Sequence, residues 1–343
     1  MVEPHNCRPA VIHRRGGARF RGLVPGQHVV MEPLRAIFDI QGFFTRDQAR
    51  QVGYDDRSVA AAVRSRMWQR IRRGYYVYAD AVSGFDVVER HLLTCRCVLH
   101  SMGSDVALSH VSGALAHGLS VWNCDLSQVH VTRLDGGAGR VEAGVVHHEG
   151  LCLDEDVVEV DGMRVLQVER CAVETGSLAG AEGALVTFDS LLCQGLATHD
   201  DLARRFRLMS TWPRMRHLHV PVRMATELSQ SAGESRGRWL FWTFGLPAPQ
   251  CQFEVRDASG ILRGTCDWGW PCCGLLGEFD GVIKYGRLVA PGLHAGDVVF
   301  AEKKREDELR ELTGYAMIRL TWDDYSRPSL TASRVRRLLR GAA

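Results

Sequence analysis

The stretch GTCDWGWPCCGLLGEFDGVIKY, residues 264–285, decides how the C-terminal part of the chain folds. It places three carboxylates, those of Asp267, Glu278 and Asp280, in an otherwise apolar segment. Successive side chains of a strand point to opposite faces, so we expect Glu278 and Asp280 to share one face of a strand over residues 275–280. A turn over residues 271–274 would return the chain antiparallel and set Asp267 beside that face.

Crowded carboxylates on a half-buried sheet need a partner. They repel one another and lose hydration, so a cation or a proton is expected to offset the cost. Carboxylate oxygens are preferred ligands of Mg²⁺ and Mn²⁺, which makes Mg²⁺ (or Mn²⁺) the expected cofactor. The alternative is that these acids are solvated at strand edges and turns, with Asp280 and Gly281 forming a simple turn. Both interpretations stay open.

The flanking patterns predict the rest of a compact domain. A helix that carries Glu234 precedes the strands and ends at Gly245. In chain order we expect a helix, three strands, a helix, a strand and a closing basic helix. They are predicted over residues 226–244, 252–256, 261–270, 275–280, 297–313, 315–322 and 327–340.

This order, with Glu on the first helix, Asp on the second strand and Glu-x-Asp on the third, resembles the PD-(D/E)XK nuclease core. That core is a restriction-endonuclease-like αβββαβ fold, and the likeness is to the branch related to the very-short-patch repair endonuclease. The likeness covers residues 224–340. The stretches that carry it are Ser231-Ala-Gly-Glu234, Gly245-Leu-Pro-Ala-Pro249, Cys266-Asp267-Trp268, Gly277-Glu-Phe-Asp-Gly281, Lys284-Tyr285, Glu302-Lys-Lys-Arg-Glu-Asp307 and Arg319-Leu-Thr-Trp322.

The resemblance implies roles for individual residues. Asp267 and Glu278 would hold the divalent metal, and Glu234 would position water or complete the site. The family's catalytic lysine belongs two residues after Glu278, where this chain has Asp280. A carboxylate cannot supply the positive charge that orients the attacking water and stabilises the phosphate.

Two lysines are candidates to replace the missing one. Lys303 is the first choice, because its helix packs on the sheet in this fold, and Lys284 on the turn after the third strand is the second. A solvated lysine on the helix surface is the alternative interpretation of Lys303. Catalysis by this domain is therefore open on sequence grounds.

Residues 31–80 predict a second, smaller module. A short helix over residues 34–41 is followed by a helix capped by Thr45 and a third capped by Asp55 or Asp56. Residues 68–78 alternate like a hairpin with Gly74 near its turn. Helices followed by a basic hairpin describe a winged helix-turn-helix.

The charge of this module favours DNA as a partner. Residues 41–80 hold eight arginines and four acidic residues, a net charge of +4. Arginine suits phosphate and guanine contacts. The alternatives are a protein-contact module or ordinary solubilising charge. The predicted DNA-binding residues are Arg57, Arg64, Arg66, Arg70, Arg72 and Arg73.

The same segment resembles the N-terminal domain of AbiEi-type antitoxins of type IV toxin–antitoxin systems. The stretches that carry the likeness are Gln41-Gly-Phe-Phe-Thr-Arg46, Gln48-Ala49 and Arg72-Arg-Gly-Tyr-Tyr-Val77. In that family the winged helix binds promoter DNA. The resemblance therefore implies DNA binding and allows a toxin partner, while the oligomeric state stays unknown.

The middle region, residues 81–222, is expected to be an α+β scaffold. We predict helices over residues 85–102, 107–117, 170–176, 180–194 and 200–209, and strands over residues 128–133, 141–149 and 163–168. A metal site at His147 and His148 is disfavoured, because neighbouring strand residues point to opposite faces.

Composition bounds the remaining possibilities. The chain of 343 residues is long enough for two or three domains, and its 42 basic and 40 acidic residues do not by themselves indicate a nucleic-acid partner. Eleven cysteines without CxxC spacing disfavour zinc and are typical of free thiols in a reducing cytoplasm. The sequence contains no run of about 18 apolar residues, so no membrane span is predicted.

The predicted organisation is an α/β multidomain chain. We expect a disordered arm (1–30), the winged helix (31–80), the middle domain (81–222) and the nuclease-like domain (223–343). Two functions fit: a DNA-binding, metal-dependent endonuclease that hydrolyses phosphodiester bonds, or an antitoxin-like transcriptional regulator whose nuclease-like domain is inactive.

Overall fold

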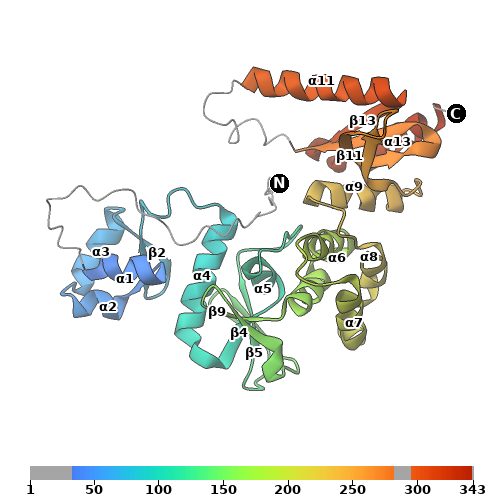
Figure 1. Cartoon of the computed structure of the whole chain (residues 1–343). Helices are drawn as coiled ribbons and strands as arrows, with labels where there is room; N and C mark the ends of the chain where they lie inside the picture. Colours follow the sequence, from blue (N-terminus) through green and yellow to red (C-terminus); the bar gives the residue numbers. More distant parts are fainter. Residues whose placement is uncertain (1–32, 282–294, 342–343) are drawn as a thin grey trace. The chain divides into compact units, whose positions relative to one another are not determined.

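A computed structural model describes residues 33–281 and 295–341 of the chain (Figure 1). The described residues form a mixed α/β multidomain structure with three sheets. They fall into two compact units, the first with residues 33–119 and 124–175 and the second with residues 120–123, 176–281 and 295–341. The predicted disordered arm over residues 1–30 lies outside the described residues.

The first unit begins with three short helices and a three-stranded sheet. Thr45 caps α2 through a capping box with Gln48, and Asp55 caps α3 by accepting from the Ser58 amide. The sheet is antiparallel in the order β1-β3-β2, and Gly74 turns the β2–β3 hairpin with φ of 82°. The caps and hairpin occur where they were predicted. The elements are α1 (Pro33–Gln41), β1 (Phe44–Thr45), α2 (Arg46–Gln51), α3 (Asp56–Arg64), β2 (Trp68–Arg72) and β3 (Tyr75–Tyr78).

The rest of the first unit is a mixed six-stranded sheet in the order β6-β7-β5-β4-β9-β8, accompanied by α4 (Val87–Met102) and α5 (His110–Ala116). Short 3-10 turns, η1 (Gly103–Asp105) and η2 (Asp154–Asp156), precede β4 and β8. The strands are β4 (Val106–Leu108), β5 (Val129–Arg133), β6 (Arg140–Glu142), β7 (Val145–His148), β8 (Val157–Val160) and β9 (Met163–Leu166).

Two predictions for this sheet are wrong. The helix predicted over residues 107–117 begins only at His110, because Val106–Leu108 is a fully buried strand between β5 and β9. A short apolar run does not distinguish a buried strand from a buried helix. The strand predicted over residues 141–149 is two strands, since Ala143 and Gly144 both have positive φ and turn the chain between β6 and β7. Strand β8 was not predicted.

The helical part of the second unit leads to α9 (Ala232–Thr243). The helices predicted over residues 170–176 and 180–194 form α6 (Val168–Cys193), which is interrupted at Gly180 by non-helical φ and ψ of 74° and 175°. The helix predicted over residues 226–244 begins later, at Ala232, because Ser231 caps it. Between α6 and α9 lie α7 (His199–Met209), η3 (Arg216–Leu218) and α8 (His219–Met224).

The second unit ends with a four-stranded sheet in the order β10-β11-β12-β13. Figure 1 labels β11 and β13 of this sheet. The first three strands are antiparallel, whereas β12 and β13 run parallel with Glu278 opposite Arg319. Trp268, Trp270 and Phe241 fill the core between this sheet and α9. The elements are β10 (Gln250–Arg256), β11 (Leu262–Trp270), η4 (Pro271–Cys273), β12 (Leu275–Asp280), α11 (Ala295–Thr313), β13 (Ala316–Thr321), α12 (Trp322–Ser326) and α13 (Pro328–Gly341).

Candidate functional site

Glu234 is held in the first turn of α9 by the packing of that helix on β12. A Cβ atom at the preceding Gly233 would come within 2.1 Å of the Phe279 ring, so only glycine allows this close approach. The buried carboxylate of Glu234 accepts from Ser231 Oγ at 2.7 Å, the Gln230 amide at 2.9 Å and Gln252 Nε2 at 3.2 Å. Burial, reinforced by repulsion from Asp267, raises the pKa of Glu234 well above its ordinary value.

Asp267 lies on β11, one residue before a ladder pair with β12. Trp268 of β11 pairs with Gly277 of β12 in an antiparallel register, so Asp267 and Glu278 are the next residues opposite each other on the two strands. Its Oδ2 accepts from the Phe279 amide at 2.6 Å, which fixes the carboxylate against the third strand. Asp267 and Glu278 therefore occupy neighbouring positions on adjacent strands, as predicted. The negative charge of Asp267 also acts on Glu234 of α9 and helps to raise its pKa.

Arginines surround Glu278 and Asp280. Arg319 Nη2 lies 3.3 Å from Glu278 Oε2, and its Nη1 lies 3.6 Å from Asp280 Oδ2. Arg305 Nη2 contacts Glu278 Oε1 at 3.2 Å, and Arg319 also pairs with Glu306 at 3.0 Å. Glu278 and Asp280 thus share one side of β12, as strand alternation predicts, and the side chain that joins them is a guanidinium.

The arginine partners were not predicted, although the sequence contains a signal for one of them. Arg319 begins the quoted stretch Arg319-Leu-Thr-Trp322, and parallel pairing of the third and fourth strands places it opposite Glu278. Arg305 reaches from α11, whose register on the sheet depends on tertiary packing. Of the candidate lysines, Lys284 lies outside the described residues, and Lys303 lies on α11 with a side chain outside the described part.

The described contacts of Asp267 and Glu278 involve oxygens that would otherwise be open to a divalent cation. Both oxygens of Glu278 contact guanidinium groups, and one oxygen of Asp267 accepts from a backbone amide. Among the side chains that the structure describes, no three His, Cys, Asp or Glu residues are arranged to hold a metal ion. Binding Mg²⁺ at Asp267 and Glu278 would require Glu278 to release Arg305 and Arg319.

The arginines of the N-terminal module divide into paired and unpaired sets. Arg46 and Arg50 both contact Asp56, Arg50 at 3.0 Å. The second set is exposed and has no acidic partner among the described residues; it consists of Arg57, Arg64, Arg66, Arg70 and Arg73. Arg72 differs from the other predicted DNA-binding residues, because it is half-buried beside the Tyr75 ring and its Nη1 is buried without a partner.

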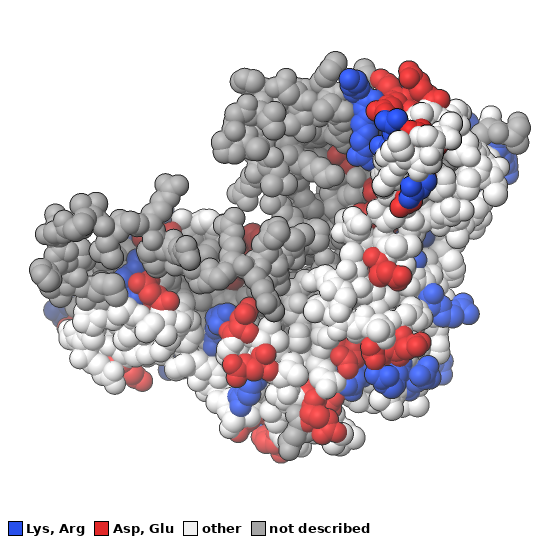
Figure 2. Space-filling view, viewed as in Figure 1, with Lys and Arg blue, Asp and Glu red and all other residues white. Residues whose placement is uncertain are grey.

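The unpaired set is concentrated on α3, the turn after it and the β2–β3 hairpin. Arg57 and Arg64 are seven residues apart on α3 and therefore share one face. Arg70 lies on β2 and Arg73 on the hairpin turn. Elsewhere the charges mix: on the part of the surface that Figure 2 shows, basic side chains are interspersed with acidic ones.

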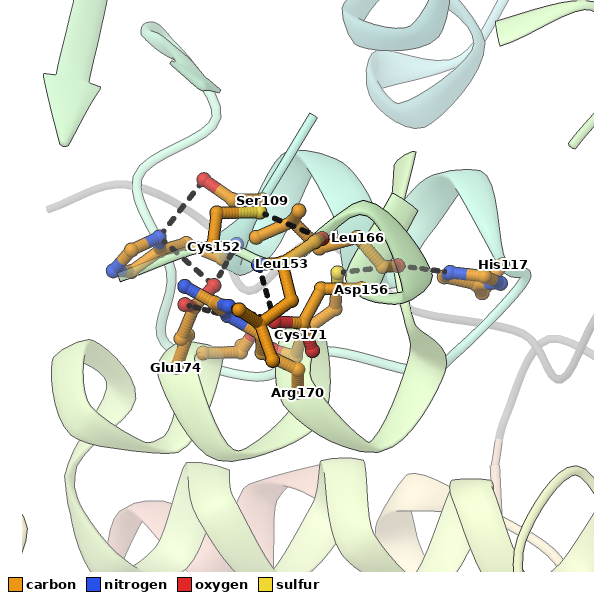
Figure 3. Close-up of polar contacts among 11 residues, drawn as sticks. Ser109, His117, Cys152, Leu153, Asp156, Leu166, Arg170, Cys171 and Glu174 are labelled. Atoms are coloured by element: carbon orange, nitrogen blue, oxygen red, sulfur yellow. Dashed lines mark hydrogen bonds and ion pairs between the residues drawn. The ribbon is translucent and has the colours of Figure 1, made fainter. Parts of the chain in front are cut away.

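A buried polar network that the sequence did not reveal lies in the first unit (Figure 3). Arg170 joins Asp156 and Glu174, each at 2.9 Å. Glu174 Oε2 accepts from the His110 amide at 3.2 Å and faces its Nδ1 at 3.4 Å. His110 has a φ of 48°, a left-handed conformation that this anchoring holds in place.

Three imidazoles extend the network. The ring of His110 stacks on that of His148 at 3.6 Å, and His148 Nε2 lies 2.9 Å from His130 Nδ1. Burial is the main cause that lowers the pKa of His130 and of His148 to about 4, so both rings are neutral near pH 7. Parallel stacked rings do not aim their lone pairs at a common point. The rings of His110, His130 and His148 pack on one another inside the first unit, and the absence of a metal site at His147 and His148 stays a prediction.

No family model matches the sequence, and no curated protein matches it. No helix among the described residues is long and apolar enough to cross a membrane.

Proposed function

We propose that this protein binds duplex DNA through its N-terminal module and acts in the cytoplasm as an antitoxin-like transcriptional regulator. The order of helix, strand, two helices and hairpin in residues 33–78 fits a winged helix-turn-helix. In such a module the second helix of the motif, here α3, enters the major groove while the hairpin lies along the backbone. A toxin partner is compatible with this role.

The observation that carries the proposal is the distribution of unpaired arginines. Within a module where Asp56 neutralises two arginines, five others on α3, its C-terminal turn and the hairpin are left exposed. Each guanidinium that reaches a phosphate releases condensed counterions and adds to a salt-dependent affinity. Arginine also reads guanine through two parallel hydrogen bonds.

Duplex binding by the full-length chain tests this proposal. We expect Arg57→Ala with Arg64→Ala and Arg70→Ala to reduce the slope of log K against log salt by about 2.7, about 0.9 for each lost phosphate contact. The matched control is Arg46→Ala with Arg50→Ala, whose arginines already contact Asp56. Equal slopes for wild type and the triple variant would refute the proposal.

Under this proposal the C-terminal sheet is a nuclease-like fold without catalysis. The order helix, three strands, helix, strand fits the PD-(D/E)XK core. Asp280 replaces the expected lysine, and Arg319 joins Asp280 to Glu278. A carboxylate set that is neutralised by arginines is stable without a metal, which favours a binding platform.

A second candidate, a Mg²⁺- or Mn²⁺-dependent endonuclease, is favoured by Glu234 and Asp267. These two carboxylates repel each other beside a buried helix terminus, and a cation between them would relieve that repulsion. Plasmid and single-stranded DNA with Mg²⁺ or Mn²⁺ would be compared for wild type, Asp267→Ala and Glu278→Ala. Cleavage that both substitutions abolish would establish the endonuclease, whereas duplex binding without cleavage supports the regulator.

A further inference from the structure

Helix α13 carries a basic surface in the second unit. Its sequence PSLTASRVRRLLRG contains four arginines and no acidic residue. Arg334 is engaged, since it contacts Asp324 at 3.2 Å and donates to the Arg319 carbonyl at 2.8 Å. Arg336 is half-buried and anchored, because it donates to the Phe244 carbonyl at 2.7 Å. The two remaining arginines are therefore the ones to explain.

Arg337 and Arg340 are exposed, three residues apart, and have no hydrogen-bond or ion-pair partner among the described residues. Together with Arg336 they line a shallow pocket of about 320 Å³, open to solvent, that also includes Ser333 and Gly341. Like charges at these helical spacings repel one another. An anion in the pocket would offset that repulsion.

The pocket on α13 differs from the larger one beside α2 and α3. That pocket, of 760 Å³, is lined by Asp55 and Asp56 as well as by arginines, and Arg50 there already contacts Asp56. Two carboxylates in the lining repel an anion. The α13 pocket has no acidic residue in its lining, so no carboxylate there opposes an anion.

We propose that Arg337 and Arg340 bind the phosphate backbone of DNA, which gives the second unit a DNA contact of its own. This inference rests on the proposed DNA binding of the first unit. Arg337 and Arg340 are exposed within one helical turn, about 4.5 Å apart along the helix axis, so one stretch of phosphate backbone can meet both guanidinium groups.

The lining favours nucleic acid over a protein partner. Protein interfaces place apolar and aromatic anchors at their centre. This pocket presents guanidinium groups, one hydroxyl and a glycine, with no aromatic or aliphatic anchor. Arginine forks bind two phosphate oxygens at once, and such contacts hold the backbone without reading sequence.

The test uses full-length protein, a labelled short duplex and a salt series. We expect Arg337→Ala with Arg340→Ala to reduce the salt slope by about 1.8, about 0.9 for each lost contact. Arg337→Lys with Arg340→Lys retains the charges and most of the slope. The matched control, Arg256→Ala with Arg263→Ala, removes the same charge from arginines that already contact Glu254 and Asp257. Melting curves verify that each variant is folded.

The same assay separates this inference from the proposal for the first unit. If the Arg57, Arg64 and Arg70 triple variant reduces the slope and the α13 variant does not, the inference about α13 is overturned and the first proposal stands. If only the α13 variant reduces the slope, the proposal that the first unit binds DNA is overturned, and the inference about α13 loses its basis. The last measurement is the binding of inorganic phosphate at constant ionic strength. If Arg337→Ala with Arg340→Ala loses phosphate binding but keeps the wild-type salt slope for the duplex, α13 binds an anion other than DNA and the inference is overturned.

Discussion

The N-terminal module and the C-terminal sheet use arginine in opposite ways. In the module, Arg57, Arg64 and Arg70 are exposed and lack acidic partners among the described residues. In the sheet, Arg319 contacts the described carboxylates of Glu278, Asp280 and Glu306, and Arg305 contacts Glu278. A count of charges does not distinguish the two cases, because the pairing decides whether an arginine is available to a phosphate or neutralises a neighbour.

The largest effect is expected from removing the central arginine of the sheet. Arg319→Ala leaves Glu278, Asp280 and Glu306 close together without their shared cation. We expect a loss of about 2 kcal/mol in the free energy of unfolding, less than for a fully buried pair because these groups are partly solvated. Urea unfolding followed by tryptophan fluorescence measures it, since seven of the eight tryptophans belong to the second unit.

The control for that measurement comes from the other region. Arg64→Ala removes an exposed arginine that has no ion-pair partner in the described part of the chain, and it is expected to change stability by less than about 0.5 kcal/mol. Combining Arg319→Ala with Glu278→Gln should recover part of the loss, because one of the repelling charges is removed. Equal stability of Arg319→Ala and wild type would contradict the role given to Arg319.

The two units are also expected to respond to acid in opposite directions. In the first unit the pKa of His130 and of His148 is lowered to about 4, mainly by burial. Unfolded histidine titrates near about 6.5, so stability is intact above that pH and falls as the pH drops towards 4, by about 1 to 2 kcal/mol per imidazole at pH 5. Asp125 near His130 and Glu174 near His110 reduce this effect.

In the second unit, burial raises the pKa of Asp189 to about 6 despite its contact with Arg238. Its folded pKa lies above the unfolded one, so its contribution to stability is present at low pH and is lost as the pH rises through about 6. Hydrogen exchange at pH 7 and pH 5, corrected for intrinsic rates, should show faster opening at β5 and β7 and no such change around Asp189. His148→Gln serves as the control, and an unchanged acid response in that variant would contradict the assignment.

A smaller effect concerns Mg²⁺. Because arginines neutralise Glu278, millimolar Mg²⁺ should leave the melting temperature of the wild type unchanged. Arg305→Ala with Arg319→Ala removes both guanidinium groups from Glu278, and Mg²⁺ at tenfold excess over its Kd would stabilise that variant by about 1.4 kcal/mol. A wild-type shift that Asp267→Ala abolishes would instead favour the endonuclease.

The smallest effect distinguishes two neighbours on the hairpin. Arg70 is exposed, whereas Arg72 is half-buried beside Tyr75. We expect Arg70→Ala to reduce the salt slope of duplex binding by about 0.9 and Arg72→Ala to leave it nearly unchanged. Fluorescence anisotropy resolves the pair, and equal slopes would place Arg72 among the DNA contacts as the sequence alone predicted.

Local signals in the sequence predicted much of the fold. Thr45 and Asp55 mark helix starts through side-chain hydrogen bonds to nearby amides, and the alternation of residues 275–280 fixes which acids share a face. Strand β4 was missed because all three of its residues are apolar and buried, so the sequence lacks the alternation of polar and apolar residues that marks a half-exposed strand. Such strands are recognised only from their neighbours in the sheet.

Only part of the candidate site was predicted, because local sequence patterns do not show which side chains meet through tertiary packing. The positions of Asp267, Glu278 and Asp280 follow from strand alternation and a short connection. The partners of these acids come from other elements: Arg305 from α11 and Arg319 from β13, whose side chains meet only through tertiary packing. The histidine network depends likewise on β5, β7 and α5 being placed together, so no local pattern indicated it.

The most direct test of the contrast between the two arginine sets is chemical modification of the full-length protein with phenylglyoxal, with and without duplex DNA, read by mass spectrometry. The account predicts that Arg57, Arg64 and Arg70 are modified in the free protein and protected by DNA. Arg319, held by its carboxylates, should react slowly and to the same extent in both conditions. Protection of Arg319 with no protection of the α3 and β2 arginines would contradict the account.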